Sequence, residues 1–288
     1  MESSLRIYER PRLRNPNLVI GWADAGFVGT TTVDYLIDKL EAEEFGEIEP
    51  RDFSLPPNSI IQGGVLEDIE YPESSFYYWK NKKSTNDLII FGSKPPAIYE
   101  HEFANLILDV AELFRVNRIY TVGGIYSNTA HTEQPRIFAI INNPRLKKYL
   151  AHYDVELGSD YRGPASMNGL ILGFAKHRNI EGISLWGRVP SYIGDIPNPR
   201  VCEAVLRILT RMLAIDIDLS EIESEAQQAN KQIDELVTFI RRENPDIDRH
   251  IQNLERSTGT EVSEQDKQRF FKEIEEFLRK KKGRREND

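Results

Sequence analysis

Short runs of consecutive apolar residues alternate with longer stretches in which apolar residues recur every three or four positions. The runs occupy residues 18–22, 88–92, 118–124, 137–141 and 183–186. The stretches occupy residues 28–40, 100–114, 168–177 and 201–213. A continuous apolar run is typical of a strand that is buried on both faces, and the wider spacing is typical of an amphipathic helix. The alternation predicts an α/β fold with three layers, α/β/α, around a mostly parallel sheet.

The segment between residues 53 and 79 lacks any helical pattern. Residues 65–69 and 76–79 both have the composition of strands, and Pro72 separates them. We expect these two strands to form an antiparallel hairpin or an insertion at the edge of the sheet.

The last quarter of the chain has a different pattern. Of the 18 glycines, 16 precede residue 200, and so do 14 of the 15 prolines, so few helix breakers follow. Apolar residues then step alternately by three and four positions from Leu219 to Ile240, which is the spacing of a coiled-coil seam. This change predicts an α/β domain over residues 1–217 and an all-helical, coiled-coil-like extension over residues 218–288 with a basic, disordered tail.

Amphipathic helices of this kind are not stable alone in water, so their apolar faces must be covered. We expect the extension to pack on itself, on the α/β domain or on a second copy, and to drive or cap self-association. The residues assigned to oligomerisation are Leu219, Ile222, Ile233, Leu236, Ile240, Phe270, Ile274 and Phe277.

Charge and composition exclude several classes of protein. A net charge of −9 argues against broad nucleic-acid binding, because phosphates attract positive surfaces. The single cysteine, Cys202, allows no intrachain disulfide and is expected in the core. No apolar run approaches the ~20 residues of a membrane span, and the first residues lack the apolar core of a signal peptide. We therefore expect a cytoplasmic protein with neither a membrane nor a nucleic acid as partner.

The sharpest local motif is the glycine-rich segment 21–30, which follows the first apolar run and leads into a helix. Ligands bind at this position in open α/β sheets, and helix N-termini attract anions. The segment matches neither the Walker A nor the G-x-G-x-x-G motif, and Asp24 places a negative charge where a phosphate would lie. A tight turn with close helix–strand packing is favoured, and a ligand-binding cleft at the strand ends is the alternative. The residues of that candidate cleft are Gly21, Asp24, Gly26, Gly29, Gly123, Gly124, Gly163 and Pro164.

Other polar clusters are weaker candidates for a catalytic or metal site. Ser127, His131 and Glu133 follow the third apolar run, but no G-x-S-x-G elbow surrounds a serine in the required context. The histidines match no spacing of a metal site. We expect hydrogen bonding within a loop here, and no catalytic residue, metal or cofactor.

Several segments, taken in order, resemble the proteasome assembly chaperone 2 family. They are the glycine-rich segment 21–29, Leu55-Pro56-Pro57, Gly123-Gly124, Tyr161-Arg162-Gly163-Pro164, Gly169-Leu170-Ile171-Leu172 and the strand at 183–186. The resemblance covers about residues 5–220. It implies an α/β/α fold similar to that of nucleoside phosphorylases, homo-oligomers, and a chaperone or adaptor role around the proteasome core.

These observations lead to one functional hypothesis and one alternative. The hypothesis is a non-enzymatic, homo-oligomeric assembly chaperone whose partners are further copies of itself, with a trimer as one arrangement, and proteasome core subunits. The alternative is a nucleotide- or nucleoside-binding protein or enzyme that uses the strand-end cleft. Archaeal members that dock on the proteasome end in a hydrophobic residue, a tyrosine and any residue, whereas this sequence ends Arg284-Arg285-Glu286-Asn287-Asp288. We therefore expect the α/β domain or the extension, and not these last residues, to carry any proteasome contact.

Overall fold

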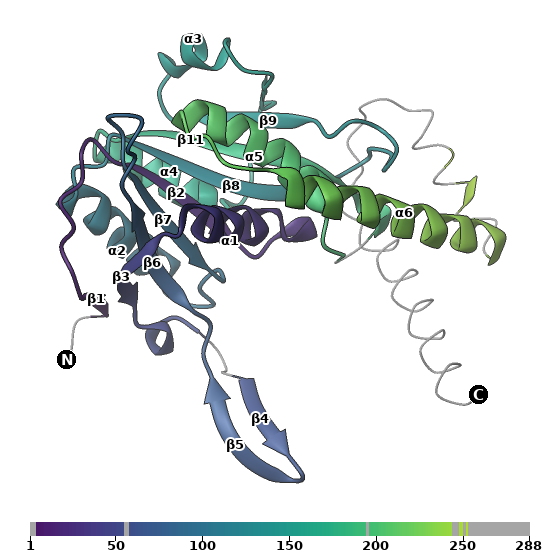
Figure 1. The fold of residues 1–288 in the computed structure, drawn as a ribbon, viewed down its shortest axis with the longest axis horizontal. Coiled ribbons are helices and arrows are strands. Elements are labelled where there is room, and N and C mark those ends of the chain that lie inside the picture. The colour runs from purple at the N-terminus through teal and green to yellow at the C-terminus, as the bar shows by residue number, and fades with distance from the viewer. Residues whose placement is uncertain (1–3, 55–57, 194–195, 244–247, 250–251, 253–288) are drawn as a thin grey trace.

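A computed structural model describes residues 4–54, 58–193, 196–243, 248–249 and 252. Its centre is a nine-stranded sheet with the order β1-β3-β6-β7-β2-β8-β11-β9-β10 (Figure 1). The strands are β1 (Leu5–Ile7), β2 (Asn17–Trp22), β3 (Glu43–Ile48), β6 (Ser74–Trp79), β7 (Leu88–Ser93), β8 (Arg118–Ser127), β9 (Ile137–Ile141), β10 (Glu156–Leu157) and β11 (Glu181–Pro190). A separate hairpin contains β4 (Asn58–Gln62) and β5 (Val65–Glu70).

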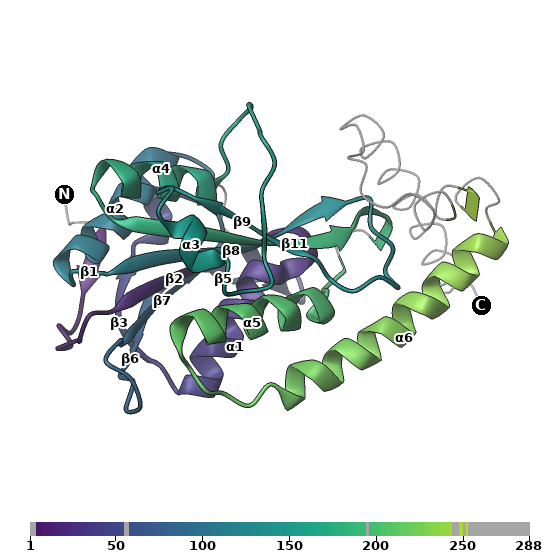
Figure 2. The same ribbon diagram turned by 90° about the horizontal axis from the view of Figure 1, so that it is seen from above.

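Helices cover both faces of this sheet (Figures 1 and 2). They are α1 (Val28–Leu40), α2 (Glu100–Leu113), α3 (Leu146–Leu150), α4 (Met167–His177), α5 (Pro199–Leu213) and α6 (Ser220–Glu243), with short 3-10 turns η1 (Ala25–Phe27), η2 (Pro50–Asp52) and η3 (Ser191–Ile193). α1 and α5 pack on one face, with α6 against α5, and α2 and α4 pack on the other face. An apolar core lies on each side of the sheet, and the predicted three-layer α/β/α class is confirmed.

The strand directions are more mixed than the sequence predicts. The four central strands β7, β2, β8 and β11 are parallel to one another. On one side β6, β3 and β1 join in antiparallel pairs, and on the other β9 runs antiparallel to β11. A parallel neighbour needs a long crossover, usually a helix, whereas only a loop joins β8 to β9. An apolar run indicates that a strand is buried on both faces, but it does not indicate the direction of the strand.

The segment between residues 53 and 79 pairs differently from the prediction. β5 pairs with β4, whereas β6 lies inside the main sheet between β3 and β7. The expected pairing of residues 65–69 with residues 76–79 is therefore wrong. The hairpin turns at Gly63 and Gly64, which both have positive φ, of 58° and 83°. Two-residue hairpin turns require this conformation, which glycine adopts at little cost.

The C-terminal extension begins with α6 at the position that the seam predicted. Four of its apolar side chains are buried: Ile222, Ala226, Ile233 and Val237. Ile222 and Ile233 join the chain's own core beneath α5, and Leu219 packs at its margin. The side chains of Leu236 and Ile240, and Phe270, Ile274 and Phe277 altogether, lie outside the described residues. The oligomerisation role of these residues and the boundary after residue 217 stay predictions.

Candidate functional site

The glycine-rich segment forms a turn between β2 and α1, and the Asp24 carboxylate sits at its centre. Oδ1 of Asp24 accepts a hydrogen bond of 3.1 Å from the N–H of Gly29, in the first turn of α1. Oδ2 accepts one of 2.8 Å from the N–H of Gly124, on β8. The first N–H groups of a helix have no partner within the helix and attract anions. The Asp24 side chain therefore already occupies the position in which a ligand phosphate would accept these hydrogen bonds.

The glycines around the turn let the backbone of the turn contact the strands directly. A Cβ on Gly124 would lie 2.0 Å from the carbonyl oxygen of Ala25. A Cβ on Gly21 would lie 2.3 Å from the carbonyl oxygen of Gly29. Backbone atoms thus fill the space between the strand ends and α1. This is the close helix–strand packing that the sequence favours, and a ligand-binding role for these residues stays a prediction.

The remaining residues of the candidate cleft lie in two places. A Cβ on Gly123 would lie 2.6 Å from Oδ2 of Asp24, and the carbonyl of Gly26 accepts a hydrogen bond of 2.9 Å from the turn before α5. Gly163 and Pro164 instead lie in the exposed loop that precedes α4. The structure therefore brings the first six residues of the predicted set together around Asp24 and leaves the last two on a separate loop.

Burial raises the pKa of Asp24 to about 7, and hydrogen bonds from backbone N–H groups oppose the rise. Burial acts in this direction because a carboxylate removed from water loses more solvation than the neutral acid does. In the unfolded chain the pKa of an aspartate is about 3.9. The folded protein therefore holds a proton on Asp24 over a range of pH in which the unfolded chain has released it.

We expect Asp24 to make the protein less stable as the pH rises from about 4 to about 7. In this window the folded state binds more protons than the unfolded state, so the free energy of unfolding falls, by up to about 1.4 kcal/mol per pH unit. Asp24→Asn removes this dependence, at a constant cost of about 1–3 kcal/mol for the backbone N–H that then faces the amide nitrogen. Urea denaturation of both proteins between about pH 4 and 7 measures how much larger the free energy of unfolding is for the wild type than for Asp24→Asn. This difference should shrink as the pH rises. A constant or growing difference would contradict the raised pKa.

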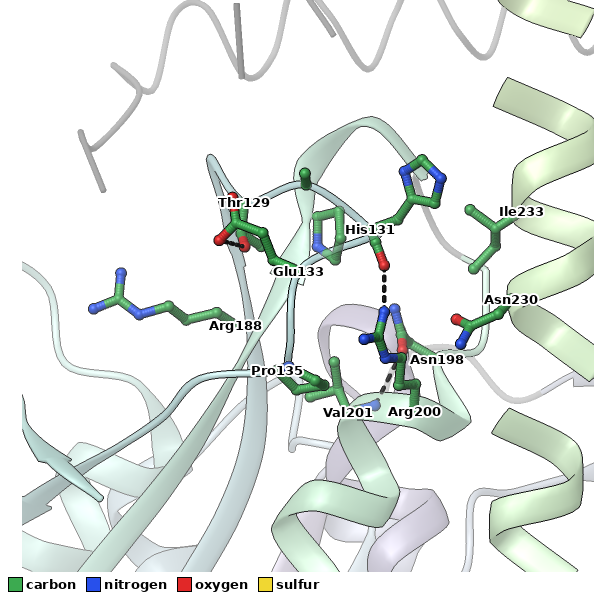
Figure 3. A pocket seen from close by; sticks show the side chains of 12 residues that line it. Thr129, His131, Glu133, Pro135, Arg188, Asn198, Arg200, Val201, Asn230 and Ile233 are labelled. Carbon is green, nitrogen blue, oxygen red and sulfur yellow. Dashed lines mark hydrogen bonds between the residues drawn. The ribbon is translucent and has the colours of Figure 1, made fainter. Parts of the chain in front are cut away.

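A second polar cluster surrounds His131 in the loop between β8 and β9 (Figure 3). Nδ1 of His131 lies 2.5 Å from the hydroxyl of Tyr192 in η3, and Nε2 lies 2.9 Å from Oδ1 of Asp234 in α6. The carbonyl oxygen of His131 accepts a hydrogen bond of 2.5 Å from Arg200 at the start of α5. His131 therefore connects its loop to three other elements of the chain, one of them the C-terminal helix.

This geometry does not fit the hydrolase interpretation of the loop. A general base must lie within hydrogen-bonding reach of its nucleophile, but the partners of the His131 ring nitrogens are Tyr192 and Asp234 and not Ser127. The pocket beside His131 encloses ≈ 10 Å³, which is room for about one water molecule. Within the described part of the chain, no group of three or more His, Cys, Asp or Glu side chains could hold a metal ion. Cys202 is fully buried, as expected, and its burial raises the pKa of the thiol.

The cluster around His131 could not be predicted from local sequence patterns. Its ring partners Tyr192 and Asp234 lie 61 and 103 residues away along the chain. One neighbouring feature did carry a signal. The side chain of Asn198 caps α5 by accepting a hydrogen bond from the N–H of Val201, and Pro199 follows in the first turn, which is a common start for a helix.

The model of the PAC2 family matches residues 18–237. The match includes the Asp24 turn, the His131 loop and most of α6. Uncharacterized protein MJ1210 of Methanocaldococcus jannaschii is 27% identical over 229 residues, which are 79% of this chain and 85% of the relative. None of the helices that the structure describes has both the length and the apolar character that crossing a membrane demands.

Solved structures show the same architecture. The crystal structure of Pyrococcus furiosus PbaB, an archaeal proteasome activator, is 27% identical with a TM-score of 0.69, and the match covers 81% of this chain and 97% of PbaB. The Mycobacterium tuberculosis protein Rv2714, of unknown function, has a TM-score of 0.76 at 18% identity and covers 99% of this chain. At 18% identity, the second likeness shows the fold alone.

Proposed function

Because this chain belongs to the PAC2 family, we propose that it is a chaperone-like protein that binds the proteasome core particle and is not an enzyme. The family match confirms the resemblance that the sequence motifs indicated. The observation that carries the proposal is the similarity to PbaB, described as an archaeal proteasome activator, over 97% of the length of that protein. The site of action that we infer is the cytoplasm, as the sequence predicts.

The two polar sites support binding rather than catalysis. Asp24 uses its carboxylate oxygens to join the N-terminus of α1 to β8, and so maintains the fold at the strand ends. His131 uses both ring nitrogens to join a loop to η3 and α6. Each group is thus occupied by other parts of the same chain. A nucleotide would have to displace such contacts at either place.

We extend the proposal to self-association, with the helical extension over residues 218–288 as the segment that drives or caps it. The support is the sequence pattern, because the amphipathic helices expected in the extension need a cover for their apolar faces. The assembly is a homo-oligomer, for which a trimer is one arrangement. The domain boundary after residue 217 belongs to this proposal, and α6 also packs on the α/β body.

Binding to proteasome core particles from the source organism tests the proposal directly. We expect the purified chain to co-sediment with the core particle and to change its rate of peptide hydrolysis. Removing residues 284–288 serves as the control, and it should change the free energy of binding by less than about 0.5 kcal/mol, the scale of an exposed charge. If the protein does not co-sediment with the core particle even at a saturating protein concentration, the proposal is wrong.

A thermal-shift series with nucleotides and nucleosides tests the alternative function on the same preparation. A ligand of the folded state raises the free energy of unfolding by RT ln(1 + [L]/Kd), so genuine binding grows with ligand concentration. We expect no rise in Tm. A concentration-dependent rise that Asp24→Ala abolishes would instead support a ligand site at the strand ends.

A further inference from the structure

The β4–β5 hairpin has one apolar face that none of the described residues covers. Residues that pair across two strands share a face, as do residues two apart on one strand. Ile61 pairs with Leu66, and Ser59 pairs with Ile69, so Ile61, Leu66 and Ile69 lie on one face. We call these three residues the hairpin face. All three are exposed.

The hairpin extends away from the body of the protein (Figure 1). Along its two strands every residue is exposed except Ile60, which is half-buried. A two-stranded hairpin with no packing against other elements is marginally stable in water. An apolar face on such an element is therefore best explained by a surface that covers it in an assembly.

A second apolar surface lies where the central strands extend past the helix layer. α4 begins beside Gly123, since Asn168 Nδ2 lies 3.2 Å from the position of a Cβ on that glycine. Further along β8 and β11, and on the neighbouring strand β9, pairing places five side chains on the α4 side of the sheet. We call them the sheet-end face: Ile125, Phe138, Ile140, Trp186 and Arg188.

The sheet-end face has the composition of a protein-binding surface. The rings of Phe138 and Trp186 stack at 6.5 Å, and the Arg188 guanidinium lies 5.3 Å from the centre of the Phe138 ring. Ile125 and Ile140 are exposed at its margins. Aromatic residues and arginine are enriched at protein interfaces, where they contribute most of the binding energy.

Charge decides which surface fits the hairpin. The hairpin carries Glu67, Asp68 and Glu70 and contains no lysine or arginine between residues 58 and 70. Two hairpins placed face to face would bring like charges together, which opposes that pairing. The sheet-end face contains the cation of Arg188, whose Nη2 forms a loose ion pair of 3.8 Å with Glu156 and whose Nε is buried without a hydrogen-bond partner among the described residues.

We propose that the hairpin face of one copy docks on the sheet-end face of a second copy of this chain. This inference rests on the self-association proposed above, in which the helical extension then caps the assembly, and it names the two surfaces that meet between copies. The two surfaces differ, so the contact is head-to-tail and leaves one free hairpin and one free sheet-end face in each pair. Repetition of such a contact closes a ring when the rotation allows it, which accommodates a trimer.

Two aspartate substitutions on neighbouring residues test the hairpin. Leu66 is 57% exposed and Val65 is 60% exposed, but Val65 pairs with Gln62 on the opposite face. Leu66→Asp should convert the oligomer to a monomer in light scattering, whereas Val65→Asp should leave its mass unchanged. Neither should move the Tm of the monomer, because the hairpin lies outside both cores.

A mixing experiment tests the head-to-tail geometry. Ile140→Asp, at a position 46% exposed, should also give a monomer. The Leu66→Asp copy retains an intact sheet-end face, and the Ile140→Asp copy retains an intact hairpin. An equimolar mixture should therefore form a one-to-one dimer and nothing larger.

The outcomes separate the two levels of the inference. A wild-type chain that is monomeric at its highest soluble concentration would overturn both self-association and the docking proposal. An oligomer that survives Leu66→Asp, or a mixture of the two variants that stays monomeric, would overturn the docking proposal and leave self-association through the helical extension intact.

Discussion

Gly124→Ala should lower the free energy of unfolding by about 3 kcal/mol, the upper part of the range for overpacked positions. The added methyl group would lie 2.0 Å from the carbonyl oxygen of Ala25 and 2.9 Å from Cγ2 of Val28. The first of these is a backbone atom and cannot rotate away. Relief requires the turn to move off β8, which also breaks the hydrogen bond from Gly124 to Asp24.

Gly173→Ala is the matched control for this substitution. Gly173 lies within α4, and a Cβ at this position would meet nothing within 4 Å. Alanine favours a helix over glycine by about 0.5–1 kcal/mol, so the control should be slightly stabilised. Urea denaturation followed by circular dichroism measures both variants. Equal stability of Gly124→Ala and the wild type would show that the turn does not pack on β8 as described.

The layers of the fold could be predicted because they depend on local pattern. The stretch at 28–40 became α1 and the stretch at 100–114 became α2, since the apolar residues of each form one continuous face. Strand direction depends instead on the connections. The loop between β8 and β9 contains no helix, and this indicates that β9 runs opposite to β8 and therefore antiparallel to β11, which is parallel to β8.

The pairing of the hairpin was missed although its signal stood in the sequence. Gly63-Gly64 between two short strand-like segments is typical of a two-residue hairpin turn. The partner of residues 65–69 lies across this turn, in β4, and not downstream among the aromatic residues of β6. The aromatic strand is apolar because it lies between β3 and β7, in the interior of the sheet.

The candidate site could be predicted only in part, because its contacts are long-range. Local spacing identified the glycines of the turn, and also Asp24 as an obstacle to phosphate. It could not show that the Asp24 carboxylate accepts a hydrogen bond from Gly124, 100 residues later. The same holds for His131, whose role follows from which elements the topology brings to its loop.

The packing of the helical extension could not be predicted, because either the α/β body of the same chain or a second copy could bury its apolar seam. A strict heptad repeat drifts by ~20° per heptad relative to a straight helix. A helix that packs on its own body therefore buries residues that a coiled coil would not. The structure buries Val237, which lies outside the heptad seam, alongside Ile222 and Ile233. This face of α6 therefore packs on the body of its own chain.

Ile222→Ala should accordingly lower the free energy of unfolding by about 3 kcal/mol, within the range for a buried aliphatic side chain. Ile222 is 0% exposed and packs in the core with α5. The base of α6 is held by further contacts with α1, where the Tyr35 hydroxyl donates a hydrogen bond of 2.8 Å to the carbonyl of Asp218 and Lys39 pairs with Glu221. The cavity left by the substitution is therefore not relieved by a shift of the helix. For a chain of this size, Tm should fall by roughly 6–12 °C.

Ser224→Ala is the control, since Ser224 is exposed on the same helix and should stay within about 0.5 kcal/mol of the wild type. Denaturation is repeated over a range of protein concentrations. If Ile222 stabilises the fold of one chain, the loss in free energy of unfolding does not depend on protein concentration. If Ile222 acts only between copies, the loss changes with protein concentration, because association contributes to stability by mass action. A Tm that is unchanged in dilute solution, together with a lower mass in light scattering, would mean that the seam of α6 belongs to the assembly and not to the α/β body.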